Sequence, residues 1–150
     1  MPQSSLPNAS LIDANVILRY LLADHPDLHA RAKALLDDVR VGHRTVVVTE
    51  AVVAECVYVM QRLYRVPRAE IVDKLGGLLG YRGIAGADVP VLRRALAVYG
   101  ETNLSFADTL LAARAQALKL PVTTFDEALK RFVTRKPSNA QTDAEPNESQ

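Results

Sequence analysis

Short β-type runs alternate with longer segments of helical periodicity along nearly the whole chain, and this alternation constrains the fold more than any other feature. Strands are expected at 9–12, 44–49, 84–85 and 121–124. Helices are expected at 16–22, 26–39, 50–64, 67–79, 88–99, 105–118 and 126–132. Strands separated by helices need crossover connections, which give a mostly parallel sheet covered on both faces. The sequence therefore predicts an α/β fold, a three-layer α/β/α domain with a short, mostly parallel sheet flanked by helices.

Residues that favour helix starts mark several of these boundaries. Pro26 and Pro67 suit the first turns of their helices, because proline lacks the N–H that a first turn leaves unpaired. Thr49 and Ser105 are expected to cap the helices that follow them. Each boundary therefore rests on a side chain as well as on periodicity.

The chain is expected to form one domain with a polar tail at each end. A length of 150 residues suits a single core. Residues 1–8 and 136–150 are polar, lack periodicity and are predicted to be disordered, which leaves 9–135 as the domain. No apolar run approaches the ~18 residues of a membrane span, and the start does not resemble a signal peptide. The single Cys excludes an internal disulfide and a cysteine-built zinc site, so a cytoplasmic location is expected.

The net charge of +1 conceals a basic body. Residues 137–150 hold three acidic residues and no Lys or Arg, so the rest of the chain holds all 18 basic residues and 14 of the 17 acidic ones. A basic surface suits a polyanionic partner.

Four carboxylates stand where a globular sequence ordinarily places apolar or neutral residues: Asp13, Glu55, Asp108 and Asp126. Asp13 and Asp126 each end an expected strand, Asp108 lies in a first helical turn, and Glu55 is expected on an inward, apolar helix face. Ligand sites of open α/β sheets gather outside the carboxyl ends of the strands. The four acids are therefore expected to converge there.

Oxygen donors without His or Cys select hard cations, so the expected cofactor is Mg²⁺, with Mn²⁺ as a substitute. Such an ion polarises a phosphodiester and lowers the pKa of a bound water. Without a cation, clustered carboxylates would repel one another. The pattern indicates metal-assisted phosphodiester chemistry.

Three of the acids also have a purely structural interpretation. Asp13 and Asp126 could each cap a helix, and Asp108 could pair with Ser105 in a capping box. Glu55 lies too far from its helix start to cap it and is therefore the strongest single indication of a site.

The chain resembles the PIN-domain family, and within it the VapC-type toxins of bacterial and archaeal toxin–antitoxin pairs. The matching segments are Leu11–Leu18, Val52–Val57, Phe106–Ala113 and Val122–Asp126, in the family's order, and they span about residues 9–133. The resemblance implies a Mg²⁺-dependent endoribonuclease that leaves 5′-phosphate and 3′-hydroxyl ends. It also implies a homodimer, an antitoxin partner and an RNA substrate.

The resemblance assigns roles to individual residues. It implies that Asp13, Asp108 and Asp126 hold the metal, and that Glu55 orients the attacking water or binds a second ion. It places Asn15, Thr124 and Ser105 as supporting polar positions that hydrogen-bond the acids.

Several assignments stay open on the sequence alone. Arg19 and Arg114 either contact phosphate or are solvated helix charges. The large apolar residues of 17–21 and 57–64 either meet a second copy or an antitoxin, or pack in the core.

Two other functions also stay open. The first is a catalytically silent module of the same scaffold that binds nucleic acid or protein. The second is a phosphoryl-transfer domain with Asp13 as nucleophile, which needs a Lys directly after a late strand. Lys119 and Lys130 only flank that strand, which argues against the second alternative.

Overall fold

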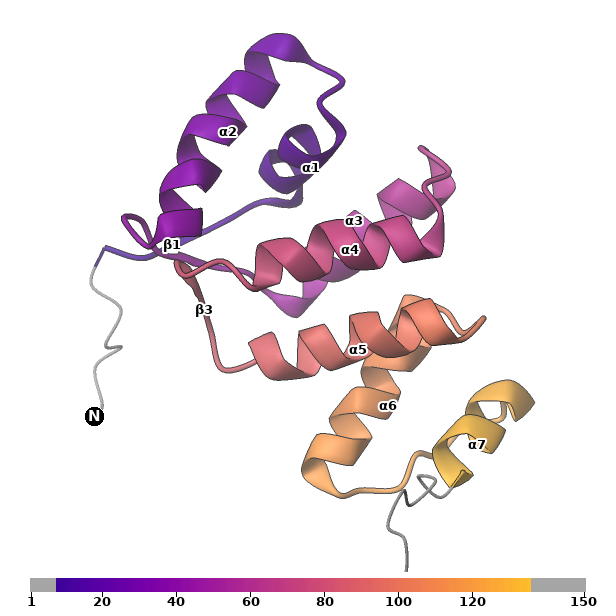
Figure 1. The fold of residues 1–150 in the computed structure, drawn as a ribbon. Helices are drawn as coiled ribbons and strands as arrows, with labels where there is room; N and C mark the ends of the chain where they lie inside the picture. Colours follow the sequence, from indigo (N-terminus) through magenta and orange to yellow (C-terminus); the bar gives the residue numbers. More distant parts are fainter. Residues whose placement is uncertain (1–7, 136–150) are drawn as a thin grey trace, which may run out of the picture.

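The computed structural model describes residues 8–135, so both expected tails lie outside the described residues apart from Asn8. Three strands and seven helices alternate within this range (Figure 1). They are β1 (Ser10–Leu11), α1 (Ala14–Leu22), α2 (Pro26–Val41), β2 (Val46–Val47), α3 (Glu50–Arg62), α4 (Arg68–Leu79), β3 (Ile84–Ala85), α5 (Val89–Glu101), α6 (Phe106–Leu118) and α7 (Glu127–Thr134). In this part of the chain no helix is long and apolar enough to cross a membrane.

The sheet is short and wholly parallel, in the order β1-β2-β3. Ser10 pairs with Val46, and Val46 pairs with Ile84. All three strands run in one direction, so their carboxyl ends lie at one edge of the sheet. The expected α/β architecture is confirmed: a helix-rich domain around a short parallel sheet.

The predicted strand at 121–124 is wrong. This segment is not part of the sheet, and β1 is an edge strand. Val122 packs instead against a small apolar cluster of Leu104, Ala112 and Leu129 that is separate from the main core. The packing of Val122 and α7 on α6 therefore holds this segment outside the sheet, despite its β-type sequence.

The main core lies between the sheet and the first six helices. Its largest fully buried side chains include Ile17, Leu36, Met60, Leu75 and Tyr99. Ile17, Val57 and Met60, which the sequence left open as interface residues, are ordinary core residues. Leu63 is 72% exposed and remains available to a partner.

Arg68 ties the start of α4 to the connection between α5 and α6. Its Nη1 donates to the carbonyl oxygens of Tyr99 at 2.9 Å, Thr102 at 3.2 Å and Leu104 at 2.9 Å, and its Nη2 donates to that of Asn103 at 3.3 Å. The guanidinium also lies 4.0 Å from the centroid of the Tyr99 ring. A cation is favourable against the carbonyl end of a helix. Arg68 therefore fixes the loop that leads into α6.

Candidate active site at the carboxyl ends of the strands

Asp13 follows β1 directly and begins α1. Its backbone is extended (φ −84°, ψ 152°), as a residue before a helix requires, but its side chain makes no capping hydrogen bond. The carboxylate is exposed and takes part in no hydrogen bond or ion pair within residues 8–135. The capping interpretation therefore does not account for Asp13.

Glu55 and Asp13 each neighbour, in sequence, one partner of a contact between α3 and α1. The Cys56 thiol donates to the carbonyl oxygen of Ala14 at 3.9 Å, which joins the middle of α3 to the start of α1. Burial, together with the negative charges of Glu55 and Asp13, raises the pKa of Cys56 to about 12. The contact brings the part of α3 that carries Glu55 close to the start of α1, which Asp13 precedes.

The expectation that Glu55 faces inward is wrong. Its side chain is exposed, whereas Val53, Cys56, Val57 and Met60 form the buried face of α3. That face follows the usual helical spacing of three and four residues, and Glu55 falls outside it. Glu55 is consequently a solvated carboxylate at the edge of the sheet, and no burial penalty demands a cation there.

Asp108 is positioned by the cap of α6. The backbone N–H of Asp108 donates to Ser105 Oγ at 3.2 Å, which confirms Ser105 as the helix cap. The Asp108 side chain is half-buried and has no hydrogen-bond or ion-pair partner in the described part of the chain. Ser105 thus holds the backbone of Asp108 rather than its carboxylate.

Asp126 acts as a helix cap, as its structural interpretation predicted. Its Oδ1 accepts from the N–H of Leu129 at 2.8 Å, and Thr124 Oγ1 accepts from the N–H of Asp126 at 3.0 Å. Asp126 lies on the segment that packs against the separate cluster of Leu104, Ala112 and Leu129. The segment before Asp126 does not pair with the sheet, so strand pairing does not position Asp126 at the carboxyl ends of the strands.

The donors suit Mg²⁺ in type but are not assembled around one point. Residues 8–135 contain no group of three His, Cys, Asp or Glu side chains placed to hold one ion. The contact between Cys56 and Ala14 brings the backbone next to Glu55 close to the backbone next to Asp13, and we call these two acids the Asp13–Glu55 pair. Within residues 8–135, neither Asp108 nor Asp126 completes a group of three with this pair. Asn15, next to the pair, is exposed and makes no side-chain hydrogen bond within this range.

Arg19 and Arg114 are both engaged by carboxylates. Arg19 Nη1 lies 2.8 Å from Asp24 Oδ2. Tyr64, which donates to that carboxylate, and Arg19 together lower the pKa of Asp24 to about 2. In this conformation Arg19 is held by Asp24, so it meets a phosphate only by giving up that pair.

Arg114 bridges two acids that the sequence reasoning did not single out. Its Nη2 lies 2.6 Å from Glu50 Oε2 and its Nη1 lies 2.9 Å from Asp88 Oδ1. Glu50 follows β2 and Asp88 follows β3. Their positions after a strand are the same sequence feature that indicated Asp13 as a site residue. Arg114 thus neutralises acids at the carboxyl ends of these two strands and leaves the Asp13–Glu55 pair without a cation.

The sequence pattern of the PIN domain family matches residues 10–134, nearly the whole described chain. The chain belongs to the PIN domain family. Searches of curated proteins and of solved structures found no match. PIN domains are generally nucleases, and they typically use divalent metals. Membership of the family indicates nuclease chemistry in general for this domain, which the geometry alone does not.

Proposed function

We propose that this PIN domain is a Mg²⁺-dependent endoribonuclease, with Mn²⁺ as a substitute ion, and that it acts as the toxin of a two-component pair. The observation that supports the proposal is the contact of Cys56 with Ala14, which brings the neighbours of Glu55 and Asp13 together just after β1. Neither carboxylate has a hydrogen-bond or ion-pair partner within residues 8–135. Exposed carboxylates without a structural partner are available to a hard cation.

The other acids extend this site in the proposal. Asp108 offers a half-buried carboxylate with no partner in the described residues. Asp126 has one oxygen engaged as a cap. A complete donor set would require both to approach the Asp13–Glu55 pair, so we derive no reaction step from the present arrangement. The proposal for these two residues rests on their donor type and on the family.

The test of the activity is an RNA-cleavage assay with the full chain. We expect labelled single-stranded RNA to be cleaved with Mg²⁺ or Mn²⁺ and to stay intact with chelator, because hard cations suit a site of carboxylate oxygens. A DNA strand of the same sequence in parallel reactions establishes which nucleic acid is the substrate. Cleavage that persists in chelator contradicts metal dependence, and cleavage of DNA alone contradicts the ribonuclease proposal.

The toxin role has a separate test in growing cells. We expect induced expression of the wild-type chain to arrest growth, and Glu55→Gln to relieve the arrest while the protein accumulates to the same level. An antitoxin or a second copy would cover exposed apolar residues such as Tyr58 and Leu63 on and after α3. Harmless high-level expression of folded wild type would contradict the toxin role and leave the nuclease proposal standing.

One observation favours a second candidate, a catalytically silent binding module. Residues 8–135 bring no three metal donors together, so fewer than the four predicted acids face any one point. Such a module would bind RNA equally with Mg²⁺ and with chelator and would cleave it in neither. The cleavage assay therefore separates the two candidates.

A further inference from the structure

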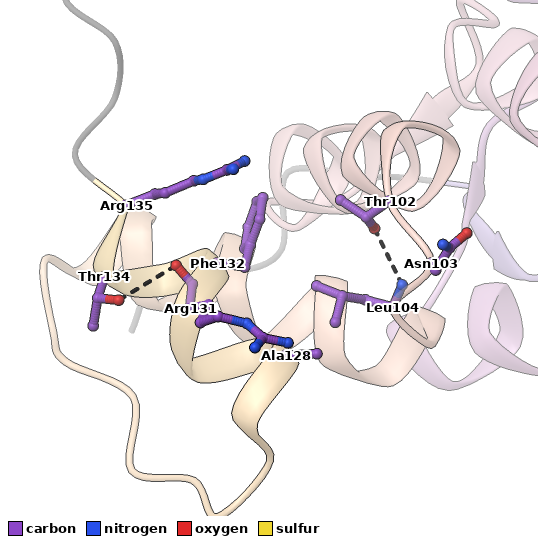
Figure 2. A pocket seen from close by; sticks show the side chains of 8 residues that line it. All are labelled: Thr102, Asn103, Leu104, Ala128, Arg131, Phe132, Thr134 and Arg135. Atoms are coloured by element: carbon purple, nitrogen blue, oxygen red, sulfur yellow. Dashed lines mark hydrogen bonds between the residues drawn. The ribbon is translucent and has the colours of Figure 1, made fainter.

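Two cavities flank α7, one on each side of the helix. The first has a volume of about 550 Å³ and lies between α7 and the α5–α6 connection, as Figure 2 shows. The second has about 560 Å³ and lies between α7 and the C-terminal end of α6. Phe132, Thr134 and Arg135 line both cavities. The two cavities thus share one wall.

Both cavities carry only positive charge. Their linings include Arg94, Lys119, Arg131 and Arg135 and no acidic residue. All four cations are exposed, and none forms an ion pair within residues 8–135. Arg19 and Arg114 differ in this respect, because carboxylates hold them. The positive charge around α7 is therefore available to an anionic ligand.

An aromatic ring lies among these cations. Figure 2 shows the Phe132 side chain between those of Arg131 and Arg135, on the side of α7 that faces Leu104. The side chain is half-buried, so part of it is accessible from the cavities. Cations that track a phosphate backbone, combined with an aromatic platform for a base, are typical of surfaces that bind single-stranded nucleic acid.

We propose that the two cavities around α7 bind single-stranded RNA, with Arg131 and Arg135 on phosphates and Phe132 against a base. This inference rests on the proposed function and identifies the residues that would hold the RNA substrate. Arg131 lies five residues after Asp126, about 8 Å along a helix axis. Arg131 and the N-cap residue Asp126 therefore belong to one short helical element, although Asp126 lines neither cavity.

The test is RNA binding measured in chelator, where cleavage does not interfere. Fluorescence anisotropy of a labelled single-stranded RNA would compare the full-length wild type with Arg131→Gln/Arg135→Gln. We expect the double variant to bind about 10-fold more weakly, with the slope of log affinity against log salt reduced by about 1.4. The matched control is Arg31→Gln/Arg62→Gln, which removes two exposed charges outside these cavities.

Phe132→Leu tests the aromatic contact with a base separately. Leucine keeps an apolar side chain against the cluster of Leu104, Ala112 and Leu129 but removes the ring. We expect at least about 5-fold weaker binding with an unchanged salt slope. Equal losses in the cavity and control variants, or wild-type binding by both cavity variants, would overturn the inference. RNA binding that depends on the cavities without cleavage in Mg²⁺ would sink the proposed function alone. Cleavage in Mg²⁺ that the cavity variants leave unchanged would sink this inference alone.

Discussion

Asp13→Asn is expected to lower the rate of RNA cleavage about 100-fold or more. The substitution keeps the shape of the side chain but removes its negative charge, and with it an anionic donor for the cation. Because the Asp13 side chain makes no capping hydrogen bond, the fold should not depend on it. The measurement is the single-turnover cleavage rate in Mg²⁺, with the unfolding transition recorded alongside.

The matched control is Asp27→Asn, which removes one exposed acid from the first turn of α2, outside the acidic site. We expect the control to cleave at nearly the wild-type rate. Asp13 and Glu55 act as one unit in this account, so Asp13→Asn/Glu55→Gln should be little slower than either single variant. A wild-type rate for Asp13→Asn, or an equal loss in the control, would remove Asp13 from the site.

Arg68→Met is expected to lower the free energy of unfolding by about 2–4 kcal/mol. Methionine preserves much of the apolar stem but donates none of the four hydrogen bonds to the carbonyls of Tyr99, Thr102, Asn103 and Leu104. It also loses the attraction between the guanidinium and the Tyr99 ring. Urea unfolding of variant and wild type measures the difference.

Two further variants serve as comparisons for the stability of Arg68→Met. Arg62→Met removes an exposed arginine from the end of α3 and should change stability by less than about 0.5 kcal/mol. Arg68→Lys should fall between wild type and Arg68→Met, because an ammonium group cannot span the same carbonyls as a planar guanidinium. If Arg68→Met unfolds at the wild-type urea concentration, the anchor of the α5–α6 connection is elsewhere.

Local features of the sequence predicted most of the fold. Pro26 lies in the first turn of α2, and the Thr49 side chain accepts from the N–H of Val52 at the start of α3. Ser105 caps α6 in the same way. These signals act within one helical turn, so they can be identified without knowledge of tertiary contacts. The three short parallel strands followed from their β-type runs between helices.

The failures arose where distant contacts decide the outcome. Residues 121–124 have a β-type sequence, but the packing of Val122 with Leu104 and Leu129 keeps the segment away from β1. Glu55 has apolar neighbours in sequence, yet the buried face of α3 lies to one side of it. The anchoring role of Arg68 was not foreseeable, because its acceptors are backbone carbonyls more than 30 residues away.

The candidate site was predicted in part. The sequence indicated four carboxylates, and the structure places Asp13 directly after β1 and Glu55 next to Cys56, whose thiol contacts the start of α1. It also shows Asp126 as a cap and Arg114 in a bridge between Glu50 and Asp88. The cap acts within one helical turn and was among the sequence interpretations of Asp126. The Arg114 bridge joins residues that are distant along the chain, so it could not be derived from residue spacing.

The most direct test of the metal-dependent site is the binding of Mn²⁺, followed by the electron paramagnetic resonance signal of the free ion. We expect wild type to remove Mn²⁺ from solution in a saturable manner, Mg²⁺ to displace it, and Asp13→Asn to bind it much more weakly. Asp27→Asn should match wild type. Identical binding curves for wild type and Asp13→Asn, or no saturable binding by wild type, would contradict a metal site at the carboxyl end of β1.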